Sequence, residues 1–280
     1  MSVVNTSPRT AKAAPQNPVA RTSLVRRRIE NLGLQLLLLG AFLALWEYAS
    51  GRWVEKILVS SPSDIWLVIV RWIGDGTYLT NLSVTLEATL GGFALGAGLG
   101  MAVGFATGLW KRLGEVLQPI LMALYTLPRL ALAPLFLMWF GLGMEFRVVF
   151  AATIVFFLVY YNTFFGVREV SRDLINAVRI MGAGRFQVLV RVIAPSALVW
   201  VAAGLKISVP YALVGVVVAE MIAGNSGMGY LLSRAAGQFS AAQSFAAIFG
   251  LLIMALILDW LITLLSARAL RWKAADRDEG

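Results

Sequence analysis

Two basic side chains lie inside long apolar stretches of the sequence, and their type and position make them the first candidates for chemistry. The stretch 116–144 is interrupted only by Arg129, and the stretch 192–219 only by Lys206. A charge inside a membrane is costly and usually faces the protein interior or water. Both side chains could therefore line a path through the membrane and attract an anion.

A structural role for the same two residues is the alternative. Arg129 lies between Pro128 and Pro134, in a stretch that we expect to bend, where its side chain could cap carbonyl groups freed by the prolines. Lys206 could extend its charged end toward the cytoplasmic side. The sequence leaves both interpretations open.

One acidic side chain, Glu220, precedes the glycine-rich segment 224–229 (GNSGMG). Glycines allow tight backbone turns. We place Glu220 at the outer end of its span, where it could lie on the path or pair with Arg147 or Arg234. An ion pair at the membrane rim contributes about 0–1 kcal/mol, so a gating role and a structural cap both remain possible.

The residue types that most enzymes need are absent from this sequence. It contains no Cys and no His, which excludes thiol nucleophiles, imidazole acid–base catalysis and zinc sites with the usual ligands. It also has no G-x-x-x-x-G-K-[ST] phosphate loop, since the nearest string, 204–206 (GLK), lacks the first glycine. We therefore predict no catalytic residue, no metal site and no cofactor bound by this chain.

The elements that must position these residues are membrane-spanning helices. The chain of 280 residues is 59% hydrophobic and 14% charged, with a mean hydropathy of +0.77, which is far more apolar than soluble domains. Crossing the bilayer takes about 20 apolar residues, and continuous apolar runs favour helices over a transmembrane barrel. The sequence predicts an all-α, polytopic membrane protein with six spans, around 32–46, 88–110, 116–144, 148–167, 192–219 and 235–258.

The distribution of basic residues predicts the orientation. If both termini are cytoplasmic, 17 of the 24 Lys and Arg residues fall on the cytoplasmic side and five on the outer side. Positive charge favours the cytoplasmic side of membrane proteins. The net charge of +9 therefore orients the chain rather than binding nucleic acid.

The predicted spans and the orientation divide the chain into segments. Between the first two spans lies an apolar segment with two Trp residues, 65–73, which is too short to cross and is expected to lie along the outer interface. Asn81 is expected to cap the second span. The segments are a disordered basic cytoplasmic tail (1–28), the first transmembrane helix (29–49), a periplasmic segment with the interfacial helix (50–81), a core of five spans (82–267) with a cytoplasmic loop (168–195), and a cytoplasmic C-terminal tail (268–280).

Five glycines are spaced four residues apart in the second span. Small residues in such a row let a neighbouring helix approach closely, because each step of four residues returns to nearly the same face. Packing within the chain is the simpler interpretation, and a place in a moving subunit interface is the alternative. The row consists of Gly92, Gly96, Gly100, Gly104 and Gly108.

The cytoplasmic loop 168–195 has the pattern of a docking element. Its first half, 173–181, is amphipathic at helical spacing, with Leu174, Ala177, Val178 and Met181 on one side. A glycine break, 182–184 (GAG), follows it. A short amphipathic helix of this kind can dock into a groove of another protein.

This loop resembles the "EAA" loop of bacterial ABC-importer permeases, whose pattern is E-A-A, three residues, G, nine residues, I-x-L-P. Ala177, Gly182 and Pro195 match at the family's spacing, whereas Asn176 stands where the family has Glu. The segments 127–143 and 219–230 resemble motifs of the nitrate/sulfonate/taurine branch of these permeases. Ala88 departs from the Arg that is common in that branch.

The resemblance implies a type I ABC importer permease fold and a multi-pass protein of the bacterial inner membrane. It implies that two copies of the chain pair. It also implies that each copy docks through the loop, here at Asn176, Ala177, Gly182, Ala183 and Pro195, onto one of two cytoplasmic ATPase subunits that use the ATP. A periplasmic or lipid-anchored binding protein would deliver the cargo. That cargo would be a small anion such as nitrate, an aliphatic sulfonate or taurine, or a related small nutrient.

An autonomous secondary transporter or channel is the competing prediction. Secondary transporters commonly show internal symmetry between two halves, and the sequence shows no convincing repeat. A membrane-embedded enzyme would need clustered catalytic groups, which the spans lack.

Overall fold

The computed structural model describes residues 18–269, and side chains from residue 31 to residue 268. Within those residues every regular element is a helix, and the only strand-type pairing is an isolated bridge between Ser50 and Val54. This confirms the predicted all-α class. The chain divides into two units, Met1–Val54 and Glu55–Gly280, which we describe separately.

The first unit contains one long helix, α1 (Pro18–Ala49), whose part Asn31–Ala49 is long and apolar enough to cross a membrane. The helix begins at Pro18 and not at residue 29, so the prediction of disorder is wrong for residues 18–28. Proline is accepted in a first helical turn, and Arg and Leu are good helix formers. The rest of the predicted tail, 1–17, and the C-terminal tail beyond residue 269 lie outside the described residues.

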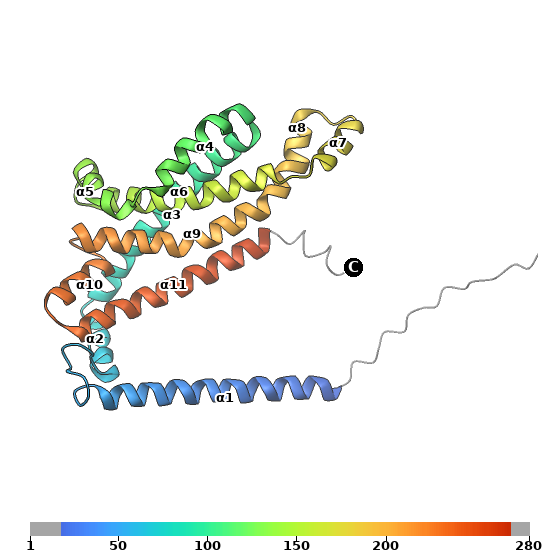
Figure 1. Ribbon diagram of the computed structural model, residues 1–280. Helices are drawn as coiled ribbons and strands as arrows, with labels where there is room; N and C mark the ends of the chain where they lie inside the picture. The colour runs from blue at the N-terminus through green and yellow to red at the C-terminus, as the bar shows by residue number, and fades with distance from the viewer. Residues whose placement is uncertain (1–17, 270–280) are drawn as a thin grey trace, which may run out of the picture. The chain divides into compact units, whose positions relative to one another are not determined.

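The second unit contains the other described helices, several of them long (Figure 1). They are α2 (Pro62–Gly74), α3 (Thr77–Leu109), α4 (Lys111–Thr126), α5 (Arg129–Phe140), α6 (Met144–Arg168), α7 (Arg172–Ile180), α8 (Arg185–Val188), a π-helical turn (Leu189–Ile193), α9 (Ala194–Ala223), α10 (Met228–Gly237) and α11 (Ala241–Ala269).

Helix α6 is the centre of this unit, because it packs along both α3 and α9. Helix α9 also contacts α11, while α10 packs on α9 and α11, and α2 packs on α11. In the part of the chain that the structure describes, five helical segments are long and apolar enough to cross a membrane. The pair α4 and α5 makes a sixth if it is counted as one span.

That pair corresponds to the third predicted span, 116–144, which is broken and not straight. Helices α4 and α5 meet at 96°. Leu127, with φ −64° and ψ 135°, and Pro128 lie between them. The helix breaks here because a residue before proline is forced out of the helical region and proline lacks an N–H donor. The result is an elbow at Leu127–Pro128, hereafter the α4–α5 elbow, with Arg129 as the first residue of α5.

The glycine row of α3 lies against α6. A Cβ built on Gly96 would lie 2.5 Å from the carbonyl oxygen of Ala152, and one built on Gly100 would lie 2.7 Å from that of Phe156. The other members of the row face α6 in the same way. The absence of side chains therefore brings two helix backbones into direct contact within one chain.

Helix α2 has the character of the predicted interfacial segment. Ser61 caps it by accepting a hydrogen bond from the backbone N–H of Asp64 at 3.3 Å, and hydrogen bonds from Ser61 and Lys56 hold the pKa of the Asp64 carboxyl below its ordinary value. Ile65 and Ile69 are buried, whereas the large apolar side chains on the other side are exposed. With 13 residues, α2 is too short to cross the bilayer.

The α3–α6 contact predicts that Gly100→Leu prevents correct folding. Its side chain would collide with backbone atoms of α6, and such overpacking costs about 3 kcal/mol or more. Gly98→Leu is the matched control, since a Cβ on Gly98 meets nothing within 4 Å. Size-exclusion chromatography and thermal unfolding of the two variants in detergent measure the difference. Equal yield and unfolding temperature would contradict this account of the contact.

Candidate functional site

Arg129 lies at the α4–α5 elbow between two aromatic rings. Its guanidinium carbon is 4.9 Å from the centre of the Phe157 ring and 5.0 Å from that of Tyr125. One terminal nitrogen donates to the Tyr125 carbonyl at 3.4 Å. Each cation–π contact contributes about 0.5–2 kcal/mol. The Arg129 charge is thus held by π faces and one carbonyl dipole.

The elbow places this charge beside the middle of a helix that is long enough to span a membrane. Phe157 lies at the middle of α6, which has 25 residues and is one of the spanning helices. Among the described residues, the Nε atom of Arg129 and the hydroxyl of Tyr161 are buried without a hydrogen-bond partner. The rings of Tyr161 and Tyr125 pack edge to face at 5.3 Å. The elbow therefore has polar hydrogen-bonding capacity deep in an apolar layer.

Lys206 does not join Arg129 in one cluster. It is exposed on α9, on a stripe that also carries Ile207, Tyr211 and Val214 at helical spacing. Within residues 18–269 the structure records no ion pair for Lys206. Its stripe is the surface of α9 that no described helix covers, so a path-lining role for Lys206 stays a prediction.

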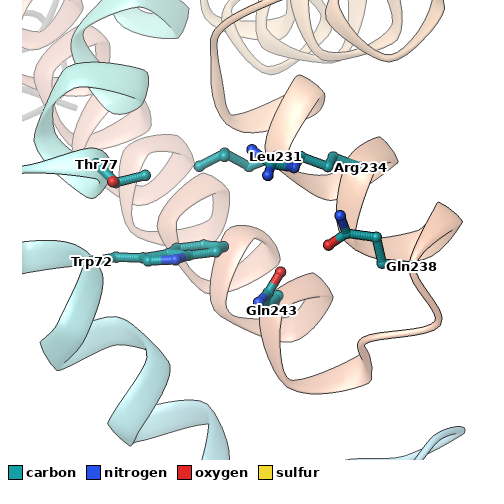
Figure 2. Close-up of a pocket in the computed structure, with 6 residues that line it drawn as sticks. All are labelled: Trp72, Thr77, Leu231, Arg234, Gln238 and Gln243. Carbon is teal, nitrogen blue, oxygen red and sulfur yellow. The ribbon is translucent and has the colours of Figure 1, made fainter.

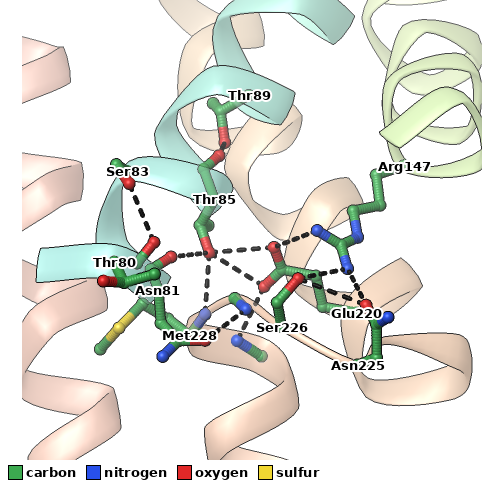
Figure 3. Close-up of polar contacts among 12 residues, drawn as sticks. Thr80, Asn81, Ser83, Thr85, Thr89, Arg147, Glu220, Asn225, Ser226 and Met228 are labelled. Atoms are coloured by element: carbon green, nitrogen blue, oxygen red, sulfur yellow. Dashed lines mark hydrogen bonds and ion pairs between the residues drawn. The ribbon is translucent and has the colours of Figure 1, made fainter. Parts of the chain in front are cut away.

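Glu220 lies in a buried polar network (Figure 3). Its side chain is fully buried, and its carboxylate accepts hydrogen bonds from the Thr85 hydroxyl at 2.9 and 3.0 Å and from the Gly229 backbone N–H at 2.8 Å. Arg147, also buried, lies 3.9 Å away as its ion-pair partner. Arg147 donates in addition to Ser226 at 3.1 Å.

The glycine-rich segment folds onto this carboxylate. Gly227 has φ +102°, a conformation that side chains rarely adopt, and a Cβ there would overlap the Glu220 carboxylate. Its N–H donates to the Asn81 side chain at 2.7 Å, and the N–H of Met228 donates to the Thr85 hydroxyl at 2.8 Å. The network thus ties α3, α6, α9 and the start of α10 together.

Two expectations about this region are wrong. Glu220 and Arg147 form the expected pair, but it is not a weak rim pair, because both side chains are removed from water and held by further hydrogen bonds. Burial within one chain also does not favour Glu220 as a path-lining residue. Asn81 does not cap α3, which begins at Thr77; it lies inside the helix and accepts from Gly227.

The loop 168–195 contains a helix, α7, that ends in a glycine turn. Gly182 has φ +88°. Its N–H bonds the Arg179 carbonyl at 2.9 Å, and the N–H of Ala183 bonds the Val178 carbonyl at 3.2 Å. This pair of bonds is the Schellman motif, which favours glycine at that position. Pro195 is the second residue of α9, but α8 and a π-helical turn run directly into α9, so Pro195 does not lie at the free start of a span as predicted.

The loop projects beyond the ends of α6 and α9 (Figure 1) and leaves apolar side chains exposed. Ile180 is 87% exposed, Met181 85% and Phe186 76%. Asn176 and Ala177 are also exposed, while Ala183 and Val178 are partly buried. Most of the predicted apolar face of α7 therefore points away from the rest of the chain and is free for a partner.

Sequence reasoning missed the residues that surround Arg129 and Glu220. Tyr125, Phe157 and Tyr161 are ordinary aromatic residues of apolar spans, and Thr85 is one of several threonines in α3. A weak signal for Thr85 existed, because a buried carboxylate needs hydrogen-bond donors from a neighbouring helix. The sequence gives no indication of which helix supplies them.

The sequence of this chain is similar to those of known transport proteins. Residues 94–271 match the family described as "Binding-protein-dependent transport system inner membrane component". The chain is 35% identical over 240 residues to a putative aliphatic sulfonates transport permease of Bacillus subtilis, covering 85% of this chain and 87% of that protein. It is 36% identical over 266 residues to a riboflavin transport system permease of Chloroflexus aurantiacus, covering 92% and 98%.

A solved structure shares the fold. The inward-facing MetNI methionine ABC transporter contains a chain that matches with a TM-score of 0.57 and 19% identity. The match covers 68% of the present chain and 93% of that one. The predicted type I importer permease fold is confirmed.

The buried network predicts that Glu220→Ala is strongly destabilising. The substitution would leave Arg147 buried without its acidic partner, which costs about 3–5 kcal/mol. Glu87→Ala, at an exposed position of α3, is the control and should change stability by less than about 0.5 kcal/mol. Thermal unfolding in detergent compares the two. If Glu220→Ala unfolds at the same temperature as the control, the network does not hold these helices together.

Proposed function

The chain belongs to the family of binding-protein-dependent transport system inner membrane components, and from this premise we propose its cargo, its partners' positions and the roles of its residues. It is the transmembrane permease subunit of an ABC importer, a multi-pass protein of the inner membrane that works with ATPase and substrate-binding partners. Its family is one of transport proteins and not of enzymes. We propose that the cargo is a small anion of the sulfonate class and that Arg129 contacts it.

The single observation that carries this proposal is the unneutralised charge at the elbow. Arg129 lies beside the middle of the spanning helix α6 and is held by the rings of Phe157 and Tyr125, with no carboxylate recorded beside it in the described chain. A guanidinium can form paired hydrogen bonds to the oxygens of an anion. The sulfonate permease relative, at 35% identity, supports the same class of cargo.

A planar heterocycle is the second candidate cargo. The Tyr125 ring contacts those of Phe157 and Tyr161, and Arg129 lies over the Tyr125 and Phe157 rings. Aromatic side chains can stack on a flat ring system. The riboflavin permease relative, at 36% identity, favours this alternative. The two candidates differ in what they require from Arg129, namely its charge or its flat stacking surface.

A second copy of this chain is the proposed partner across the path. Helix α5 has large exposed apolar side chains, including Met138 at 79% and Trp139 at 67%. The α4–α5 elbow and the stripe of α9 that carries Lys206 are likewise exposed surfaces of the second unit. Pairing of two copies through these surfaces would enclose Arg129, as a path formed by a homodimer requires.

We further propose that the loop helix α7 docks onto the ATPase subunit that uses the ATP. The exposed Ile180, Met181 and Phe186 support an apolar contact there. This chain binds no cofactor in the proposal, and both termini are cytoplasmic, with the binding protein on the opposite side. An autonomous transporter would leave the exposed loop without a purpose.

Substitution of Arg129 tests the cargo. In proteoliposomes that contain both importer subunits and the binding protein, Arg129→Gln should lower taurine or ethanesulfonate uptake about tenfold or more, since a hydrogen bond to a charged group contributes about 1.5–3 kcal/mol. Arg129→Lys should retain part of that uptake. Retained rate and affinity in Arg129→Gln would refute the path role. If Arg129→Lys lowers riboflavin uptake more than sulfonate uptake, the result would favour the heterocycle.

Substitution of Gly182 tests the docking loop. Gly182→Asp places a side chain at φ +88° and should disrupt the end of α7, so that cargo-stimulated ATPase activity and uptake are lost while the protein still inserts. Gly184→Asp is the control, because Gly184 has an extended conformation at the N-cap of α8, where Asp is favoured, and open space around it. Unchanged ATPase stimulation and uptake in Gly182→Asp would contradict the docking role.

A further inference from the structure

A polar cavity lies among α2, α3, α10 and α11, away from the residues discussed above. It has a volume of about 180 Å³. Figure 2 shows the side chains of Trp72, Arg234, Gln238 and Gln243 converging on it, with Thr77 and Leu231 completing the wall. Two pairs of consecutive helices, α2 with α3 and α10 with α11, which lie far apart from each other in the sequence, thus contribute to one small space.

The wall of the cavity supplies hydrogen-bond donors and a positive charge. Arg234 contributes a guanidinium and Gln238 and Gln243 contribute amides, while the Thr77 hydroxyl hydrogen-bonds the Asp75 carboxylate. No acidic side chain lines the cavity, and within residues 31–268 no ion pair is recorded for Arg234. Arg234 and Gln238 are exposed, so their donors can be reached from outside the chain, and a guanidinium beside two amides fits an anion such as a phosphate.

The cavity lies at the level where a spanning helix meets the lipid headgroups. Thr77 is the first residue of α3 and Gln243 is the third residue of α11, and both helices are membrane spans. Trp72 belongs to α2, and the side chains of Trp66 and Leu67 on that short helix are exposed. Tryptophan is enriched at this depth because one part of its ring system is apolar and the other polar.

We propose that this cavity binds the phosphate group of a membrane phospholipid. The phosphodiester accepts hydrogen bonds from Arg234, Gln238 and Gln243, and the Trp72 ring packs against the glycerol portion. The acyl chains continue along the exposed apolar surface of α2 into the bilayer. A bound lipid would hold α2 and α10 to the ends of α3 and α11. The assignment depends on the membrane placement of these helices and not on the cargo or on Arg129.

Lipid binding to the purified full chain in detergent micelles tests the proposal by native mass spectrometry. Dioleoyl phosphatidylglycerol should bind about tenfold more tightly than dioleoylglycerol, which has the same acyl chains without the phosphate. Arg234→Gln should remove that preference. Arg71→Gln is the matched control, because Arg71 is an exposed basic residue of α2 that does not line the cavity, and it should keep the preference within about twofold.

Three results would overturn the proposal. The first is equal binding of the two lipids to the unsubstituted chain. The second is an unchanged preference in Arg234→Gln, or in Gln243→Leu if Arg234→Gln does not fold. The third is inorganic phosphate displacing the phosphatidylglycerol at millimolar concentration and binding equally well in its absence, which would assign the cavity to a soluble anion. None of these results bears on sulfonate uptake, so the proposed cargo is tested separately.

Discussion

The direct contact between the backbones of α3 and α6 is the constraint on which the rest of the second unit depends. Lipid tails are as apolar as leucine side chains, so helices in a membrane gain little from hydrophobic burial and associate through close packing and hydrogen bonds. The glycine row supplies that packing, since each glycine faces a backbone or Cβ atom of α6. With one face fixed on α3, α6 presents Arg147 to the network near its start and Phe157 to the elbow at its middle.

Two arginines, Arg147 within α6 and Arg129 packed against it, are balanced in opposite ways. Arg147 lies 3.9 Å from the carboxylate of Glu220 and donates to Ser226. Arg129 has aromatic faces, one carbonyl and an Nε atom without a partner. A fully satisfied buried pair stabilises one arrangement of the helices, whereas an incompletely satisfied charge retains interaction energy for a ligand. This contrast assigns Glu220 a structural role and leaves Arg129 as the candidate for the path.

The sequence predicts those features that depend on local chain geometry. The spans follow from apolar length, the elbow from Pro128, and the end of α7 from Gly182, because each is decided by neighbouring residues. It fails for the Glu220 network, in which Thr85 and Glu220 are 135 positions apart and their contact exists only once α3 and α9 have packed. For the same reason the predicted cap at Asn81 is wrong, because its acceptor role toward Gly227 depends on a loop 146 positions away.

The connections of the loop 168–195 determine how a movement of α7 would reach the spanning helices. Only a few residues separate the end of α6 from α7, and α8 continues through a π-helical turn, Leu189–Ile193, directly into α9. π-Helical turns are rare and occur often at functional positions. The turns on either side of α7 are short, 169–171 and 181–184, α6 and α9 are packed against each other, and α6 is held to α3. A displacement of the loop that these turns transmit therefore meets no long linker. It must either deform the π-helical turn or move α3, α6 and α9 together, and the second outcome would carry the Phe157 ring and Arg129 with it.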